Sequence, residues 1–433
     1  MKINLTLSLL FLFLNLYAQQ NVEVLKELVN LNQVSDSNED FTGYEAIKEI
    51  IQDAEIVMLG EQSHGDATTY ETKIKLIKYL HQKMDFDILA FESGFFECQK
   101  AWTQIQKGED VRTQMGKSIF DIWSAVKDLK PLVEYIEGTY NTAQPLAIAG
   151  FDSQMLCKLG SEFFVKDLKA YLSHTVQLDT TIDYKREFTH LENSINLISS
   201  AKFKEYKKEA AIKDIAFLDI VLGKIQIVEK DTSTSFWIQN IINTKLFLSD
   251  LKLKTDHRDQ QMAENLIWLK EQYPNKKIIC WGATSHFLYN SSEVRMDKKV
   301  MQLLGGNHYK KHAMMGDYIK EKYGKKVCTI GFIAYEGYYG YMGRKKLSTA
   351  KNNSLEYLIG KSGYDNCLLS LRGLSLSPYI SRPLGHFYMK TDIAIVMDAV
   401  IFNRYMKAPE LDVNFFLKIY PENKYLKPIP AGQ

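Results

Sequence analysis

Short apolar runs recur along the chain, separated by longer segments in which apolar and polar residues alternate with helical spacing. The clearest runs are rich in Ile, Val, Leu and Phe, and Gly or Ser follows each apolar stretch. They are EIVMLGE, DILAFES, LAIAGFDS, KIICWGATSH and VCTIGFIAYEG, which end at Glu61, Ser93, Ser153, His286 and Gly337. Runs of this kind are typical of strands buried on both faces of a parallel sheet. We therefore predict an α/β fold with a mostly parallel central sheet flanked by helices.

Helical patterns connect these strands. The segment from Thr68 to Lys83 carries apolar residues at helical spacing, and Thr68 with Glu71 fits a capping box. From about residue 160 to residue 270 charged and apolar residues alternate with helical period, which predicts a helical insertion of roughly a hundred residues. Further strands are expected in DNCLLSLRG, LGHFYMK and DIAIVMDAVIFNRYM near the C-terminal end.

The first residues, MKINLTLSLLFLFLNLYAQQ, have the layout of a secretory signal peptide: a lysine, a short apolar run, then small or polar residues. We expect a signal peptide over residues 1–18 and one domain over residues 19–433. The protein is then exported, either periplasmic or secreted. No later segment is apolar enough over its length to span a membrane, so no membrane span is expected after processing.

The amino-acid composition limits the kinds of partner that the protein is expected to bind. The chain has 54 Lys plus Arg against 52 Asp plus Glu, so general attraction to nucleic acid is not expected. The five cysteines are widely spaced and mostly sit in apolar runs, which indicates buried thiols and not a disulfide framework. The oligomeric state is left open.

Polar residues gather where the predicted strands end. They are Glu61 and His64, Glu92, Asp152, then Thr284, Ser285 and His286, and finally Tyr335 and Glu336. In an open parallel sheet, ligands bind outside the carboxyl ends of the strands. We therefore expect a site built from these side chains.

Imidazole suits this site because it titrates near neutrality. His64, between Gly60 and Gly65, is expected to take a proton from water while a carboxylate orients its ring. Glu61, Glu92 and Asp152 are all candidates for that carboxylate. The chain has no GxSxG nucleophile elbow, no HExxH and no Walker phosphate loop. His308 and His312 have a zinc-like spacing but no acidic third ligand at a recognised distance.

The blocks LGEQSHGDATTYETKIKLIKYL, ILAFESG, IAGFD, WGATSHF, MGDYIKEKYGKKVCTIGF and RPLGHFY resemble, in order and spacing, those of the erythromycin esterase-like family from about residue 40 to residue 405. The resemblance implies hydrolysis of an ester. The activity that names the family is the opening of a macrolide lactone, which is a response to an antibiotic. It implies that His64 is the general base, without a covalent acyl-enzyme. Glu61, Glu71 and Glu92 fall on the family's acidic positions, and His286 falls on a family histidine.

One position departs from the family pattern. The tryptophan block usually reads Trp-Ala-His-Asn-x-His, whereas Ala283 stands here at the first histidine. Thr284 and Ser285 are then the candidates for hydrogen bonds to the substrate carbonyl.

The leading hypothesis is an exported carboxylic-ester hydrolase for a small-molecule ester or lactone. In it, His64, Glu61, Glu92 and His286 are catalytic, Glu71, Asp152, Thr284 and Ser285 bind substrate, and no cofactor is required. The first alternative is a metal-dependent hydrolase with Glu61, His64, Glu92 and His286 as ligands. The family is similar to a wider group of proteins in which related sets of carboxylates and histidines bind a metal. A periplasmic binding protein without chemistry is the second. The natural substrate is left open.

Overall fold

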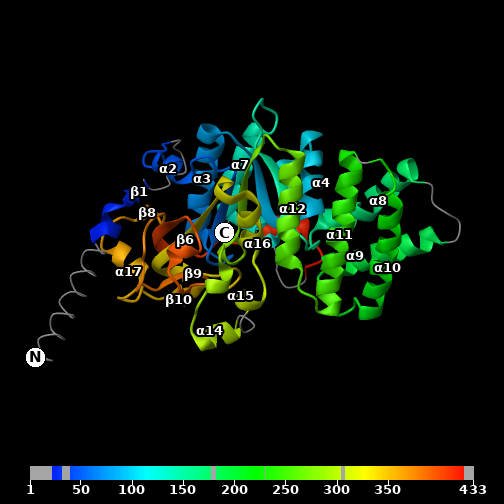
Figure 1. Ribbon diagram of the computed structural model, residues 1–433. Helices are drawn as coiled ribbons and strands as arrows, with labels where there is room; N and C mark the ends of the chain where they lie inside the picture. Colours follow the sequence, from blue (N-terminus) through cyan, green and yellow to red (C-terminus); the bar gives the residue numbers. More distant parts are fainter. Residues whose placement is uncertain (1–21, 32–39, 177–181, 230, 304–307, 424–433) are drawn as a thin grey trace, which may run out of the picture. The chain divides into compact units, whose positions relative to one another are not determined.

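The computed structural model of the protein describes residues 22–31, 40–176, 182–229, 231–303 and 308–423 (Figure 1). The predicted signal peptide, residues 1–18, lies outside the described residues. The chain divides into two compact units. The first comprises Met1–Tyr79 and Ala283–Pro409, and the second comprises Leu80–Gly282 and Glu410–Gln433. Among the described helices, none has the length and apolar character needed to cross a membrane.

The first unit contains a run of hydrogen-bonded strands in the order β1 (Leu28–Asn30), β8 (Asn366–Ser370), β11 (Ala399–Met406), β6 (Val327–Tyr339) and β2 (Ile56–Glu61). The neighbours β11, β6 and β2 run parallel. Strand β8 is antiparallel to β11, β1 is antiparallel to β8, and β7 (Lys345–Leu347) is antiparallel to β6. Every residue of β2 is buried, which is why this strand reads as an unbroken apolar run.

Helix α3 (Ala67–Met84) follows β2 almost directly and matches the predicted segment. Its predicted apolar face is buried, at Tyr70, Ile74, Ile77 and Leu80. The predicted capping box is wrong, because Thr68 lies inside the helix. Its hydroxyl donates to the Tyr405 carbonyl and accepts from the Lys407 N–H, so Thr68 ties α3 to the end of β11.

The remaining elements of the first unit are short. Strands β9 (Ser381–Leu384) and β10 (Phe387–Met389) form a separate antiparallel hairpin. The helices are α2 (Ala46–Ile51), α13 (Thr284–Phe287), α14 (Lys298–Leu303), α15 (His308–Lys311), α16 (Met315–Tyr323) and α17 (Leu355–Gly360), with 3-10 turns at Ser291–Glu293, Gly324–Lys326 and Ile393–Ile395. The β9 strand and the helical turn of α13 are not predicted by the sequence pattern.

The second unit contains three parallel strands in the order β5 (Lys277–Ala283), β3 (Phe86–Gly94) and β4 (Ala147–Asp152). Its shorter helices are α4 (Phe95–Gln106), α5 (Val111–Ser118), α6 (Asp121–Ser124), α7 (Lys130–Thr139) and α18 (Val413–Ile419), with a 3-10 turn at Lys127–Leu129. Strand, helix and strand thus alternate here, as the α/β prediction requires.

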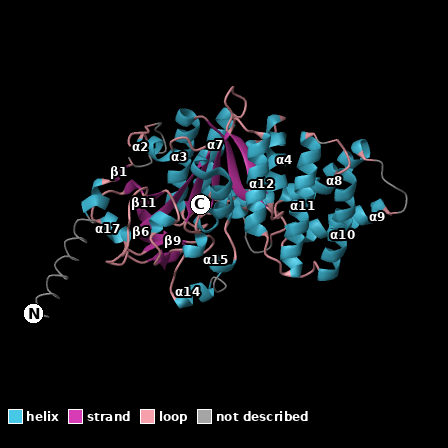
Figure 2. Ribbon diagram, in the orientation of Figure 1, coloured by secondary structure: helices cyan, strands magenta, loops and turns pink. Residues whose placement is uncertain are grey.

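Between β4 and β5 lies the helical insertion, which confirms the prediction for residues 160–270. It consists of α8 (Lys158–Thr175), α9 (Tyr184–Ser199), α10 (Lys208–Ile225), α11 (Thr232–Leu253) and α12 (Arg258–Gln272) (Figure 2). Helices α8 to α11 share a hydrophobic cluster that includes Phe164, Phe188, Phe217 and Trp237. Rings such as Phe188 and Phe217 meet edge to face, with centroids 4.9 Å apart.

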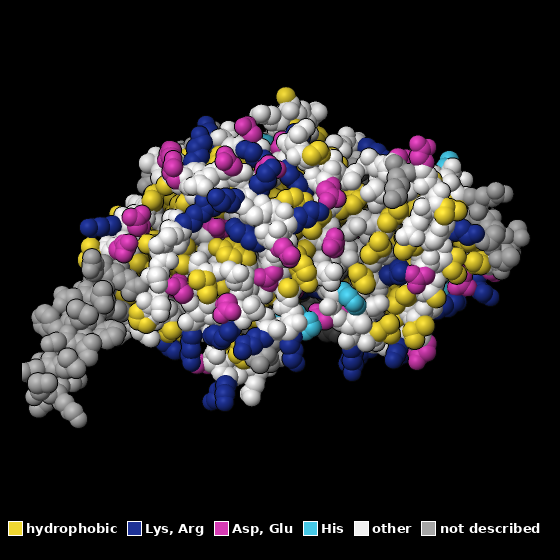
Figure 3. Space-filling view, viewed as in Figure 1, with side chains coloured by type: hydrophobic (Ala, Val, Ile, Leu, Met, Phe, Trp, Pro, Cys, Tyr) yellow, Lys and Arg dark blue, Asp and Glu magenta, His cyan; other side chains and the backbone are white. Residues whose placement is uncertain are grey.

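All five cysteines are buried and unbridged, as predicted. Charges of both signs are interspersed over the face seen in Figure 3, in keeping with the near balance of basic and acidic residues. The α/β fold with a mostly parallel sheet and a helical insertion is thereby confirmed.

Candidate functional site

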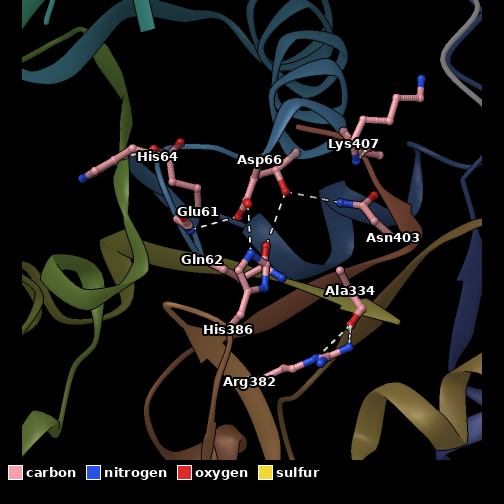
Figure 4. A network of polar contacts seen from close by, with 12 residues as sticks. Glu61, Gln62, His64, Asp66, Ala334, Arg382, His386, Asn403 and Lys407 are labelled. Atoms are coloured by element: carbon pink, nitrogen blue, oxygen red, sulfur yellow. Dashed lines mark hydrogen bonds and ion pairs between the residues drawn. The ribbon is translucent and has the colours of Figure 1, made fainter. Parts of the chain in front are cut away.

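An acid and histidine pair sits where β2 turns into α3. Glu61 Oε1 lies 2.9 Å from His64 Nδ1, and Figure 4 labels both residues. Glu61 Oε2 lies 2.7 Å from Lys73 Nζ. Glu61 and Lys73 are fully buried, whereas the His64 side chain is 39% exposed. A carboxylate can only accept hydrogen bonds, so Nδ1 carries the ring proton and Nε2 is the basic nitrogen. Glu61, one of the three carboxylates that the sequence left open, contacts His64 in the structure.

Lys73 was not predicted as a site residue. It projects from α3 and neutralises a carboxylate that has no access to solvent. Two buried charges cost several kcal/mol each to desolvate, so each requires the other. The ion pair fixes both the charge and the position of the group that holds His64.

Glycines flank His64 in the sequence, a pattern that predicts a tight turn exposing the imidazole. Neither Gly60 nor Gly65 has a positive φ, so the turn does not depend on left-handed backbone at these positions. Instead, a Cβ at Gly60 would lie 2.6 Å from Thr284 Oγ1, and one at Gly65 would lie 2.4 Å from Gly340 Cα. Glycine is needed because neighbouring segments pass too closely for a side chain.

Helix α13 carries the predicted residues that follow β5. Thr284 is fully buried against Gly60, and its hydroxyl oxygen has no hydrogen-bond partner among the described residues. Thr284 therefore packs the turn and does not present its hydroxyl to solvent. Ser285 and His286 are partly exposed in the same helix, where a ligand can reach them. Their predicted roles remain predictions.

Glu71 lies on α3 and pairs with Lys407, with 3.2 Å between Nζ and Oε1. Tyr335 and Glu336 lie within β6 and not at its end, because that strand runs to Tyr339. Glu336 accepts a hydrogen bond from Thr349. A substrate-binding role for Glu71 remains a prediction.

In the second unit Glu92 and Asp152 meet at one arginine. Arg258, the first residue of α12, places Nη2 at 2.6 Å from Asp152 Oδ2 and at 3.0 Å from Glu92 Oε1. Its Nε lies 3.2 Å from Asp152 Oδ1. Burial lowers the pKa of Arg258, but Asp152 and Glu92 outweigh that effect and raise it. Glu92 and Asp152 thus share a cation that the sequence did not reveal, and the catalytic role of Glu92 and the substrate-binding role of Asp152 remain predictions.

A second acid and histidine pair joins the turn after β2 to the β9–β10 hairpin. His386 Nε2 lies 2.9 Å from Asp66 Oδ1, with both side chains almost completely buried. Both residues stand in blocks that carry the resemblance described above, SHGD and RPLGHFY. Those blocks were the only available signal, since 320 positions separate the two residues.

These features define an α/β protein with an oriented histidine at the end of a parallel strand, an arrangement suited to activating water. The chain belongs to the erythromycin esterase family, whose model matches residues 81–402. Glu92, Asp152, Thr284, Ser285 and His286 lie inside the matched range, and Glu61, His64 and Glu71 precede it.

The chain is similar to two named proteins and to a solved structure. The chain is 28% identical over 319 residues to "Putative hydrolase YbfO" of Bacillus subtilis (strain 168), covering 67% of each protein. It is 24% identical over 278 residues to erythromycin esterase type I of Escherichia coli, covering 57% of this chain and 65% of the relative. A solved structure of a mutant of the erythromycin esterase EreC in its open conformation shares the fold, with a TM-score of 0.68 at 16% identity over 89% of this chain and 98% of that one. The alignments with these two named relatives thus span about two thirds of each relative's length. Together, the family and these relatives support a hydrolase.

Proposed function

We propose that the protein is an exported carboxylic-ester hydrolase that opens an ester or lactone with water activated by His64, and that a macrolide is one candidate substrate. The observation that carries the proposal is the contact between Glu61 and His64, in which Lys73 holds the carboxylate from its other side. An imidazole oriented in this way has its basic Nε2 directed away from its carboxylate partner. Its partial exposure makes it accessible to water and substrate.

The reaction follows from that geometry. His64 Nε2 takes a proton from water, and the water oxygen forms a bond to the ester carbonyl carbon. Glu61 stabilises the imidazolium that results. The intermediate collapses, the bond to the alcohol oxygen breaks, and the imidazolium returns its proton to that oxygen. His286 is proposed to donate a hydrogen bond to the carbonyl oxygen, where negative charge develops.

The charges around the predicted ligands argue against a catalytic metal. Glu61 already contacts the ammonium group of Lys73, and Glu92 already contacts the guanidinium of Arg258. A divalent ion bound by either carboxylate would lie beside a fixed positive charge, which is unfavourable at such short range. The residues present therefore do not fit the metal-dependent alternative. Full activity in the presence of a chelator is expected.

Ala283 favours the other alternative, a binding protein without chemistry, because this residue offers no hydrogen bond to a substrate. The two functions make different predictions for His64→Ala. A hydrolase loses turnover, whereas a binding protein keeps its ligand affinity and shows no turnover even in the wild type.

The test is mass spectrometry of the purified mature protein incubated with a panel of macrolides and simple esters, with His64→Ala and a chelator-treated sample in parallel. Addition of one water to any substrate, absent in His64→Ala and unchanged by chelator, is the expected result. Loss of product with chelator would favour the metal-dependent hydrolase. No product from the whole panel by a folded protein would count against hydrolysis of these ester classes.

A further inference from the structure

A buried pair lies beneath the turn that presents His64. Asp66 Oδ1 faces His386 Nε2 at 2.9 Å (Figure 4). Asp66 Oδ2 accepts the N–H of Ser63 at 2.9 Å. The two side chains are 0% and 2% exposed. One carboxylate thus joins His386 to the residue directly before His64.

The same turn is held at three further points. The Gly385 N–H donates to the Gln62 carbonyl at 2.7 Å, and the Gly340 N–H donates to the Gly65 carbonyl at 2.9 Å. The Tyr70 hydroxyl donates to the His64 carbonyl. The turn is therefore attached both to the β9–β10 hairpin, through residues 385 and 386, and to the segment that follows β6.

The hairpin that supplies His386 is itself anchored. Arg382, in β9, is almost completely buried and donates to the backbone carbonyls of Ala334, Tyr335 and Ser348 at 2.6–3.2 Å. Figure 4 shows Arg382 reaching Ala334 below His386. These contacts tie the hairpin to β6, so His386 projects from a rigid support.

The backbone at His386 does not favour a histidine. Gly385 and His386 form a two-residue hairpin turn with φ values of +57° and +61°. Turns with both central residues left-handed favour Asn, Asp or Gly, so the imidazole is held there at a conformational cost. Its Nδ1 is buried and has no hydrogen-bond partner among the described residues, and the Tyr339 ring lies 4.4 Å away between centroids. The contact that offsets these costs is the one to Asp66.

We propose that His386 is a positioning residue, which through Asp66 holds the 62–66 turn and so fixes the orientation of His64. This inference rests on the proposed function, because the readout of that orientation in catalysis is hydrolysis. Small misplacements of a catalytic group reduce turnover strongly without abolishing substrate binding.

The test compares His386→Leu, which removes the donor, with His386→Gln, whose side-chain amide reaches the position of Nε2. His386→Leu is expected to lower kcat about tenfold to a hundredfold with KM within about a factor of two. His386→Gln is expected to restore most of the loss. Leu168→Ala, in the core of the helical insertion, controls for lost stability alone.

A second readout is independent of activity. In protein labelled with 15N-histidine, the ring nitrogen signals of His64, assigned by their absence in His64→Gln, are expected to shift in His386→Leu and to return in His386→Gln. Asp66→Asn is the second variant, should His386→Leu fail to fold. Ser63 and His386 contact different oxygens of Asp66, and the amide keeps an oxygen at only one of the two positions, so one of these donors loses its acceptor and the same shift is expected.

Unchanged His64 signals and unchanged kcat in folded His386→Leu or Asp66→Asn would overturn the inference. If the wild type hydrolyses nothing, the proposed function fails, and the His64 signals alone decide whether His386 positions the ring.

Discussion

The buried carboxylate of Glu61 is the residue on which the proposed chemistry of His64 depends. Glu61 is held by one cation and one histidine in a place without solvent. The sequence identifies Glu61 and His64 because they follow an apolar strand within three residues of each other. It does not identify Lys73, since a lysine on an amphipathic helix normally faces water. Arg258 and the pairing of Asp66 with His386 are hidden for a related reason, because their partners lie more than a hundred positions away.

Lys73→Met is expected to destabilise the protein by about 3–5 kcal/mol, because it leaves the Glu61 carboxylate buried without its cation. Urea unfolding followed by circular dichroism measures this loss. The double variant Glu61→Gln/Lys73→Met removes both charges and should lose less stability than Lys73→Met alone. Equal stability of Lys73→Met and the wild type would contradict the account of this pair.

A second buried carboxylate makes stability depend on pH. Burial raises the pKa of Glu97 well above 4.5, the Cys157 N–H at 2.6 Å from Oε1 lowers it, and Asp152 raises it. The native state then keeps a proton that the unfolded chain releases above pH 4.5. Stability from this group is therefore complete below pH 4.5 and declines as pH rises toward the folded pKa.

The side chain in Glu97→Gln cannot ionise. The free energy of unfolding of this variant, relative to that of the wild type, is therefore expected to rise between pH 5 and pH 8 by at most about 1.4 kcal/mol per pH unit. Unfolding free energies at several pH values measure this difference. A difference that stays constant across the range would show that Glu97 is ionised in the native protein.

At the scale of elements, strands buried on both faces were predicted well, and the short elements were not. The runs ending at Glu61, Ser93 and Ser153 correspond to β2, β3 and β4, because burial on two faces leaves an unbroken apolar pattern. Strand β9 contains the buried Arg382 and Pro383, a composition that no strand pattern favours. The ATSH segment turned out to be the end of β5 and a helical turn, since four residues carry no readable periodicity.

The turn between β2 and α3 depends on backbone proximity. Gly65→Ala would place a Cβ 2.4 Å from the backbone of Gly340, and we expect a loss of about 1–3 kcal/mol together with reduced activity, because the turn also carries His64. Gly223→Ala is the matched control. It lies in α10 with no atom within 4 Å of the added Cβ, so a gain of up to about 1 kcal/mol is expected. Thermal unfolding distinguishes the two, and equal effects would contradict the role given to Gly65.

At the scale of the whole molecule, the wide spacing of the cysteines predicts a fold that does not depend on disulfides. All five thiols are buried, and burial raises the pKa of Cys328 and Cys367 to about 12. We expect almost no reaction with a thiol reagent in the native state and five reactive thiols after unfolding in denaturant. An intact mass lower by two hydrogens would instead reveal a disulfide.

Export itself is a separate prediction from the N-terminal pattern. Expression of the full chain in a bacterium with a secretory system is expected to yield a product that begins after Ala18. N-terminal sequencing of the material released from the periplasm or medium measures this. A product retained in the cytoplasm with Met1 intact would contradict the prediction.

In the proposed mechanism His64, oriented by Glu61, activates the water. The most direct test is kcat for the best ester from the panel, measured for the wild type and for His64→Ala with equal folded fractions. In His64→Ala, kcat is expected to fall by a factor of about 10²–10⁴, the usual contribution of a general base. A kcat within a factor of two of the wild-type value would contradict it.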